Sequence, residues 1–143
     1  MAADWCVRAD AGDHYRLAFD RPDSWSLKYN LVWDKLFESH LFPQEVFEKE
    51  SAWYRSHNNA YGVPLDDRAD YTKSDWVLWC AAMGDRTVLE QLAGTVARFE
   101  RETPSRYPFS DWFDTVTGVF CHFKGRSVQA GMFMPLLVHR GLK

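Results

Sequence analysis

Residues 86–102 read RTVLEQLAGTVARFERE, and the spacing of their apolar side chains predicts one long amphipathic helix. These side chains recur at the period of a helix, about 3.6 residues per turn, and so share one face. The residues on that face are Val88, Leu89, Leu92, Val96 and Phe99. Comparable stripes in residues 26–38, 43–56 and 72–83 predict three further helices. We therefore expect an all-α fold of antiparallel helical hairpins, with no sheet larger than one pair of short strands.

Local signals predict how the first two of these helices begin. Ser24 or Ser26 is a suitable N-cap for the helix at 26–38, because a serine oxygen can accept from a free backbone N–H. Pro43 is a suitable first-turn residue for the next helix, since its φ is fixed and it has no N–H to leave unpaired. Glu50 lies within the apolar stripe of that second helix, so we expect its side chain to point inward.

Charged and aromatic residues are unusually dense in residues 61–79, YGVPLDDRADYTKSDWVLW. Within this stretch TKSD is a capping-box pattern, in which the Thr72 hydroxyl accepts from the N–H of Asp75 and the Asp75 carboxylate reaches back. The cap predicts a helix from Thr72 to near Gly84 and accounts for both residues. Alternatively, the mixed charges hold one carboxylate protonated and another ionised, as acid–base hydrolysis requires. Both interpretations stay open at this point.

The composition argues against nucleic-acid and membrane partners. The chain has 143 residues, a formal net charge of −3 and no cluster of Lys or Arg. No apolar run is long enough to span a membrane, and the first residues, MAADWCVRAD, lack the pattern of a signal peptide. We expect one domain that binds neither nucleic acid nor a membrane.

The sequence also predicts no metal site and no cofactor. Cys6, Cys80 and Cys121 have no C-x-x-C spacing, the histidines are scattered, and packed free thiols are expected. There is no G-x-S-x-G elbow, no H-E-x-x-H motif and no glycine-rich phosphate loop. The compatible chemistry is water activated by a carboxylate, with a second carboxylic acid protonating the leaving group.

Four blocks of the sequence, in this order, resemble a known family. They are SWSLKYNLVWDKLF at 24–37, YGVPLDDRADYTKSDW at 61–76, ETPSRYPFSDWFDT at 102–115 and FKGRSVQAGMF at 123–133. The family is that of the glutaminase A-like proteins, and the similar part is their C-terminal domain, which is related in fold to the six-hairpin glycosidases. The resemblance covers nearly the whole chain.

The resemblance implies an (α/α)6 toroid, in which inner and outer helices alternate around a central cleft. Residues 1–143 would then be a single domain that forms the C-terminal portion of a larger barrel and begins inside a helix. A partial toroid leaves inner helices uncovered, so self-association or association with the rest of the domain is expected. Localisation stays open, with a secreted or periplasmic parent protein among the alternatives.

The function that the resemblance implies is hydrolysis of L-glutamine to glutamate and ammonia. The small-molecule substrate would meet two catalytic carboxylates, Asp66 and Asp75. A glycosidase-like enzyme acting on a glycoside and a non-catalytic helical binding module are the alternatives. Arg68 and Lys73 are suitable donors for a substrate carboxylate or a developing oxyanion. The full set of predicted substrate-binding residues is Arg68, Lys73, Tyr71, Trp76, Asp111, Asp114 and Arg126.

Overall fold

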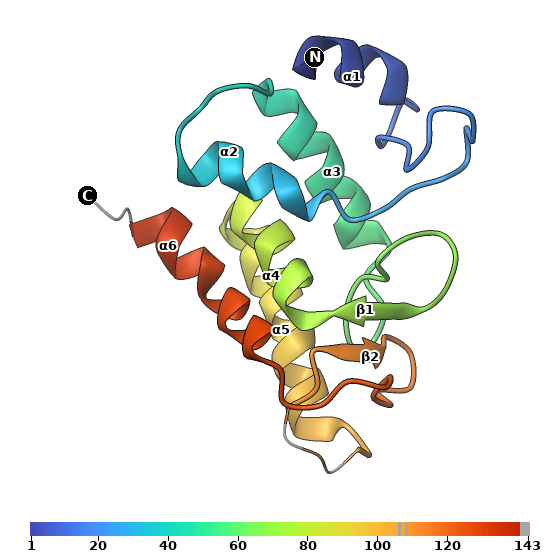
Figure 1. The fold of residues 1–143 in the computed structure, drawn as a ribbon, viewed down its shortest axis with the longest axis vertical. Coiled ribbons are helices and arrows are strands. Elements are labelled where there is room, and N and C mark those ends of the chain that lie inside the picture. Colours follow the sequence, from blue (N-terminus) through green and yellow to red (C-terminus); the bar gives the residue numbers. More distant parts are fainter. Residues whose placement is uncertain (106, 108, 141–143) are drawn as a thin grey trace.

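The computed structural model describes residues 1–105, 107 and 109–140, and within them the chain is mainly helical, as predicted (Figure 1). The α-helices are α1 (Ala2–Ala9), α2 (Val32–Leu36), α3 (Gln44–Ser56), α4 (Ser74–Met83), α5 (Arg86–Glu102) and α6 (Met134–Arg140). Two 3₁₀ helices, η1 (Tyr29–Leu31) and η2 (Ser127–Phe133), precede α2 and α6. The strands β1 (Tyr71–Lys73) and β2 (Trp112–Asp114) form one antiparallel pair.

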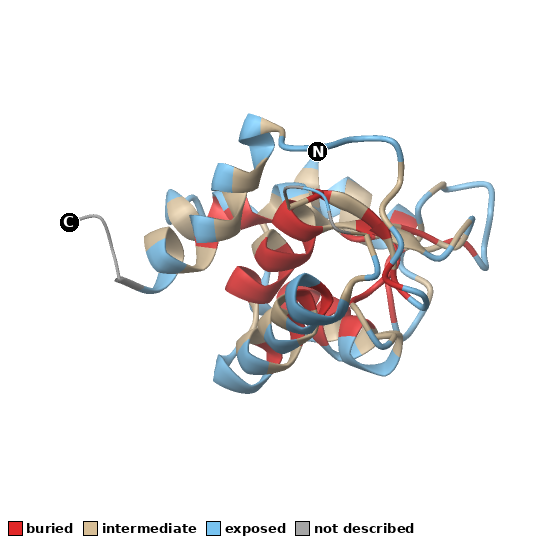
Figure 2. Cartoon of the chain, turned by 90° about the horizontal axis from the view of Figure 1, so that it is seen from below, coloured by how far each residue is buried: buried red, intermediate tan, exposed pale blue. Residues whose placement is uncertain are grey.

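Helix α4 lies at the centre of the molecule. Eight of its ten residues are buried, because its sequence, SDWVLWCAAM, is apolar on nearly every side after the first two residues. It contacts α2, α3, α5, α6 and both 3₁₀ helices. Figure 2 shows the buried residues gathered in this central region, with exposed residues on the outer helices and loops.

Helices α4 and α5 form a tight antiparallel hairpin (Figure 1). The connection is short: Asp85 caps α5 by accepting from the N–H of Val88 at 2.9 Å. A Cβ on Gly84 would come within 2.5 Å of Val88, so only glycine fits this approach. The predicted bounds of α5 are confirmed, and its buried residues are Val88, Leu92, Val96 and Phe99.

The predicted capping box is wrong. Thr72 lies in β1, opposite Phe113 of β2, and its hydroxyl has no hydrogen-bond partner within the described part of the chain. Lys73 is the residue before α4 and has extended backbone, with φ −125° and ψ 128°. The N–H of Ser74 donates to the carbonyl of Asp111 at 2.9 Å. The strand pairing therefore holds this segment extended and delays the helix to Ser74.

The predicted helix at 26–38 is also shorter than expected. Its helical part covers η1 and α2 only, and no serine caps it. The Ser24 hydroxyl instead donates to the carbonyl of Arg21 at 2.7 Å and so holds the preceding loop. Trp33 and Phe37, two of the large apolar residues within 26–38, are 39% and 69% exposed rather than buried.

Helix α3 agrees more closely with its prediction. It begins at Gln44, with Pro43 as the residue before the first turn rather than within it. Glu50 points inward as predicted and is 1% exposed, and its Oε1 accepts from the N–H of Tyr15 at 2.7 Å. In the described part of the chain no helix is long and apolar enough to cross a bilayer.

Candidate functional site

An open cavity of about 570 Å³ lies between the N-terminal segments and the start of α4. Its walls are largely aromatic and aliphatic, and the rings of Tyr29 and Trp76 stack at 4.0 Å with an angle of 10° between their planes. Three charged side chains line it: Lys28, Asp66 and Arg68. Pockets of this size and composition commonly hold small molecules.

The Asp66 carboxylate at this cavity accepts hydrogen bonds from Arg68, two residues further along the chain. The Arg68 guanidinium donates from Nε at 2.9 Å and from Nη2 at 2.7 Å, and the Arg68 N–H donates as well at 3.0 Å. The hydrogen bonds from Arg68 lower the pKa of Asp66, so this carboxylate is ionised at neutral pH. The pair is held in place because the N–H of Leu27 donates to the carbonyl of Leu65 next to it.

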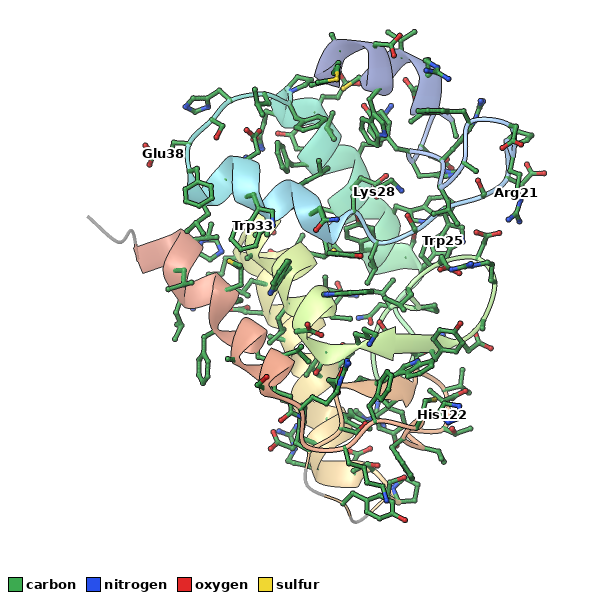
Figure 3. All side chains as sticks on the ribbon, viewed as in Figure 1. Arg21, Trp25, Lys28, Trp33, Glu38 and His122 are labelled. Carbon is green, nitrogen blue, oxygen red and sulfur yellow. The ribbon has the colours of Figure 1, made fainter. Side chains whose placement is uncertain are left out.

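Lys28 supplies a second positive charge and lies beside α3 (Figure 3). Its Nζ donates to the carbonyls of Tyr15 and Ser26 at 2.8 and 3.0 Å, and its N–H donates to the hydroxyl of Tyr54 in α3. Burial lowers the pKa of Lys28, although the nearby Glu50 acts in the opposite direction. Sequence reasoning missed Lys28, although the inward-pointing Glu50 was a signal that a buried cation lies close to it.

A second charged cluster surrounds Asp111, which is fully buried. Arg126 donates to both of its carboxylate oxygens, and the Lys73 Nζ lies 3.6 Å from Oδ2. Burial raises the pKa of Asp111, but the hydrogen bonds and charge of Arg126, together with the charge of Lys73, outweigh it and lower the pKa overall. This cluster joins three segments that are far apart in sequence.

Lys73 and Trp76 connect the two regions. The Lys73 Nζ lies 5.3 Å from the ring centre of Trp76, whose ring also stacks on Tyr29 at the cavity. The same ammonium lies 5.3 Å from the ring centre of Trp112, and Tyr71 meets Trp112 edge-on at 5.3 Å. These distances fit cation–π and edge-to-face contacts. Tyr71 thus packs against Trp112, the residue after Asp111, and not at the cavity.

Asp75 is buried beneath η2. It is 5% exposed, and its Oδ1 has no hydrogen-bond partner among the described residues. A Cβ on Gly131 would approach the Asp75 Cβ to 3.1 Å, and the Trp79 indole N–H donates to the Gly131 carbonyl at 2.9 Å. Burial raises the pKa of Asp75, and the negative charge of Asp111 raises it further. Asp75 is therefore the carboxylic acid of this region that retains its proton to higher pH.

Asp114 has a local role in the turn that follows β2. Its Oδ1 accepts from the N–H groups of Val116 and Thr117 at 3.0 and 2.7 Å, and from the Thr117 hydroxyl at 2.9 Å. Partial burial raises its pKa, but these hydrogen bonds outweigh that effect and lower it overall. Asp114 is positioned to stabilise the turn.

The predicted site residues thus divide into two groups. Asp66, Arg68 and Trp76 line the cavity. The others lie toward the Asp111 cluster, and across the described residues no hydrogen bond or ion pair joins that cluster to the Asp66–Arg68 pair. The residues outside the cavity are Tyr71, Lys73, Asp75, Asp111, Asp114 and Arg126.

Other reactive groups have ordinary structural surroundings. Cys80 is buried, and burial raises the pKa of its thiol well above the usual range. Burial also raises the pKa of Cys6 and of Cys121, so these thiols are poor nucleophiles at neutral pH. The described residues contain no group of three or more His, Cys, Asp or Glu side chains that could hold a metal ion.

A family match and two relatives found by comparison with known proteins agree with one another. The chain matches the family described as the Glutaminase A six helical-hairpin domain over residues 1–136. It is 34% identical over 128 residues to Glutaminase A of Aspergillus oryzae, which covers 87% of this chain and 19% of that protein. It is 30% identical over 131 residues to a protein of Arthroderma benhamiae named Probable glutaminase/05536, covering 73% of this chain and 15% of that protein.

The chain therefore spans less than a fifth of the length of each of these relatives. No solved structure matches it. The family match extends over most of the chain and includes both the cavity and the Asp111 cluster. The chain belongs to the glutaminase A family, within its six helical-hairpin domain.

Proposed function

We propose that this chain forms part of the active cleft of a hydrolase that releases ammonia from the side-chain amide of glutamine. The observation that carries the proposal is that Asp66 lines the cavity together with Trp76, while Asp75, next to Trp76 in sequence, has a pKa shifted in the opposite direction. Hydrogen bonds from Arg68 lower the pKa of Asp66, whereas burial raises that of Asp75. Separated pKa values of this kind assign a base and an acid.

In this mechanism Asp66 takes a proton from water, because it is the ionised carboxylate that lines the cavity. The resulting hydroxide attacks the amide carbon. Arg68 and Lys73 are proposed to hold the substrate carboxylate and the developing oxyanion between them. Arg68 lines the cavity, and the Lys73 Nζ lies outside it, 5.3 Å from the ring centre of the cavity residue Trp76. Asp75 is proposed to donate its proton to the leaving nitrogen, since its raised pKa keeps it protonated to higher pH than an ordinary aspartate. It lies outside the cavity of this chain, next in sequence to Trp76, so this step requires the complete cleft to extend past Trp76 to Asp75.

The helices are proposed to be one part of an (α/α)6 toroid. The tight α4–α5 hairpin and the family's six helical hairpins support this arrangement. Helices α2 and α6 contact each other. Several large apolar side chains on and near these two helices are exposed to solvent. We propose that this surface associates with the rest of the domain or with a second copy of the chain. Its residues are Trp33, Phe37, Leu41, Phe133 and Leu136.

An ammonia-release assay with L-glutamine tests the proposal. It should be run on the 143-residue chain and on the product of the full open reading frame that encodes it. Asp66→Asn and Asp75→Asn are each expected to lower kcat by about 100-fold or more. Asp70→Asn is the matched control, because Asp70 is an exposed aspartate of the same loop. Folded Asp66→Asn and Asp75→Asn proteins with full activity would rule out this site.

A glycosidase activity is the second candidate. The stacked Tyr29 and Trp76 rings at the cavity favour it, because sugar rings bind well against aromatic faces. A panel of glycosides in the same assay separates the two activities. Release of sugar but not of ammonia would favour the glycosidase, and release of neither, even from the full-length product, would favour a non-catalytic binding module.

A further inference from the structure

The cavity is larger and more apolar than free glutamine requires. Its volume is about 570 Å³, within the range of roughly 300–1,000 Å³ of pockets that enclose drug-sized ligands. Free L-glutamine is a small zwitterion with a polar group at each end. Placing it against apolar walls removes water from those groups without replacing their hydrogen bonds. The volume and the apolar walls of the cavity therefore indicate a ligand with a substantial apolar part.

The walls are suited to a flat apolar group. Trp5, Leu17 and Phe42 face the cavity together with the stacked pair of Tyr29 and Trp76. Trp5 meets Phe42 edge-on at 5.7 Å, so these two rings support each other. Aromatic walls bind flat rings by stacking and by edge-to-face contact.

The charges of the cavity favour an anion over a cation. Lys28 and Arg68 are positive and Asp66 is negative, which leaves a net charge of +1 from these three residues. Asp66 is already paired with Arg68 through Nε and Nη2, so it is a poor partner for an added ammonium. Among the described residues, none accepts from Arg68 Nη1, and this group remains available to a carboxylate.

We propose that the cavity binds glutamine whose α-amino nitrogen is acylated by a flat apolar group. Acylation removes the positive charge of the amino group, keeps the α-carboxylate for Arg68, and places the apolar group against the aromatic walls. The side-chain amide remains free for hydrolysis: its C–N bond breaks, a C–O bond to water forms, and the nitrogen leaves as ammonia. The inference rests on the proposed function for the glutamine part of the ligand and for this hydrolysis, whereas the apolar group and the carboxylate are argued from the cavity.

Calorimetric titration of the 143-residue chain with benzyloxycarbonyl-L-glutamine and with L-glutamine tests the proposal. The acylated compound is expected to bind at least about ten-fold more tightly. Leu17→Asp, at the cavity, should weaken its binding about ten-fold by adding a negative charge to the wall. Val119→Asp is the matched control, since Val119 is 44% exposed, close to the 40% of Leu17, but lies outside the cavity. Equal affinity for the two compounds, or equal effects of the two substitutions, would overturn the proposal.

Two further measurements separate this inference from the proposed function. The α-carboxamide of benzyloxycarbonyl-L-glutamine lacks the carboxylate and should bind about five-fold more weakly; unchanged binding contradicts the role of Arg68. Ammonia release from both glutamine compounds is measured in parallel. Tight binding of the acylated compound without ammonia release leaves the ligand class standing and removes the hydrolase. Ammonia release from free glutamine without binding of the acylated compound would retain the hydrolase and rule out the acylated ligand.

Discussion

Two arginine–aspartate pairs in this molecule use the same hydrogen bonds in different surroundings. Arg68 holds Asp66 from two positions along the chain; 62% of the Arg68 side chain and 8% of the Asp66 side chain are exposed. Arg126 holds Asp111 from 15 positions away, and the Asp111 side chain is fully buried. The first pair borders a cavity, whereas the second joins β2 to the start of η2 with Lys73 beside it.

The difference shows how burial decides what an ion pair does. A pair between near neighbours whose arginine is exposed to water contributes little to folding, so that arginine can bind a ligand as well. A buried pair between distant segments is strongly coupled to the fold, because removal of one charge leaves the other without compensation. We therefore assign ligand binding to the Asp66–Arg68 pair and tertiary stabilisation to the Asp111 cluster.

The largest expected effect is that of Asp111→Asn on stability. The substitution leaves Arg126 and Lys73 without their shared carboxylate, and the free energy of unfolding should fall by about 3 kcal/mol. Urea denaturation at neutral pH measures it. Asp114→Asn, at the other end of β2, is the control and should have a clearly smaller effect, since Asp114 is only partly buried. Equal effects would show that the Asp111 cluster stabilises the fold no more than the turn at Asp114 does.

Gly131→Ala tests the contact that covers Asp75. The added Cβ would lie 2.9 Å from the Trp79 indole nitrogen and 3.1 Å from the Asp75 Cβ, so overpacking should lower stability by about 2 kcal/mol. Gly94→Ala in α5 is the matched control, because a Cβ there meets nothing within 4 Å. That control should raise stability by about 0.5–1 kcal/mol through helix propensity. If Gly131→Ala leaves the free energy of unfolding unchanged, η2 does not pack closely against α4.

Asp75→Asn should change the pH dependence of stability. Burial raises the pKa of Asp75 in the folded chain above its ordinary value of 3.8, so the folded state binds this proton more tightly than the unfolded state. The stabilising contribution of the proton is complete below that ordinary value and is lost as pH rises through the folded pKa. The variant should thus gain stability relative to wild type over this window, by at most about 1.4 kcal/mol per pH unit. Parallel pH profiles of the two proteins would contradict the raised pKa.

Asp66→Asn is expected to have the smallest effect on stability. Asp66 is buried, but asparagine keeps an oxygen that can accept from the Arg68 N–H, and water can solvate the Arg68 guanidinium, whose side chain is 62% exposed. The melting temperature should therefore fall by only about 2 °C or less. Differential scanning calorimetry at neutral pH measures this. The same variant is expected to lose ammonia release, and that contrast separates a functional carboxylate from a structural one. A fall in melting temperature as large as that of Asp111→Asn would show that both ion pairs stabilise the fold to the same extent.

The sequence predicted the parts of the fold that depend on local interactions. The bounds of α5 were predictable because its apolar period and length are properties of one continuous segment. β1 was not, since its partner Trp112–Asp114 lies about 40 residues away and three residues carry little strand pattern of their own. The same pairing explains why the capping-box signal at Thr72 failed.

The candidate site was predictable in type but not in grouping. The dense charges of residues 61–79 indicated carboxylates beside aromatic rings, and the cavity contains Asp66, Arg68 and Trp76. The ion pair between Lys73 and Asp111 was not predictable, because it depends on the pairing of β1 with β2 and no local sequence pattern indicates that pairing. Lys28 joins the cavity only because α3 and the segment before η1 pack together.

The central position of α4 has a consequence for local motion. Because α2, α3, α5, α6 and both 3₁₀ helices rest on it, its backbone amides can reach water only when most of the molecule opens. Their hydrogen exchange should therefore report the global free energy of unfolding. Helix α1 belongs instead to a small separate apolar cluster with Tyr15 and Val46, and its amides should exchange through a local opening that leaves α4 protected. The slowest-exchanging peptide in a mass-spectrometric experiment would then be the one that contains residues 77–83.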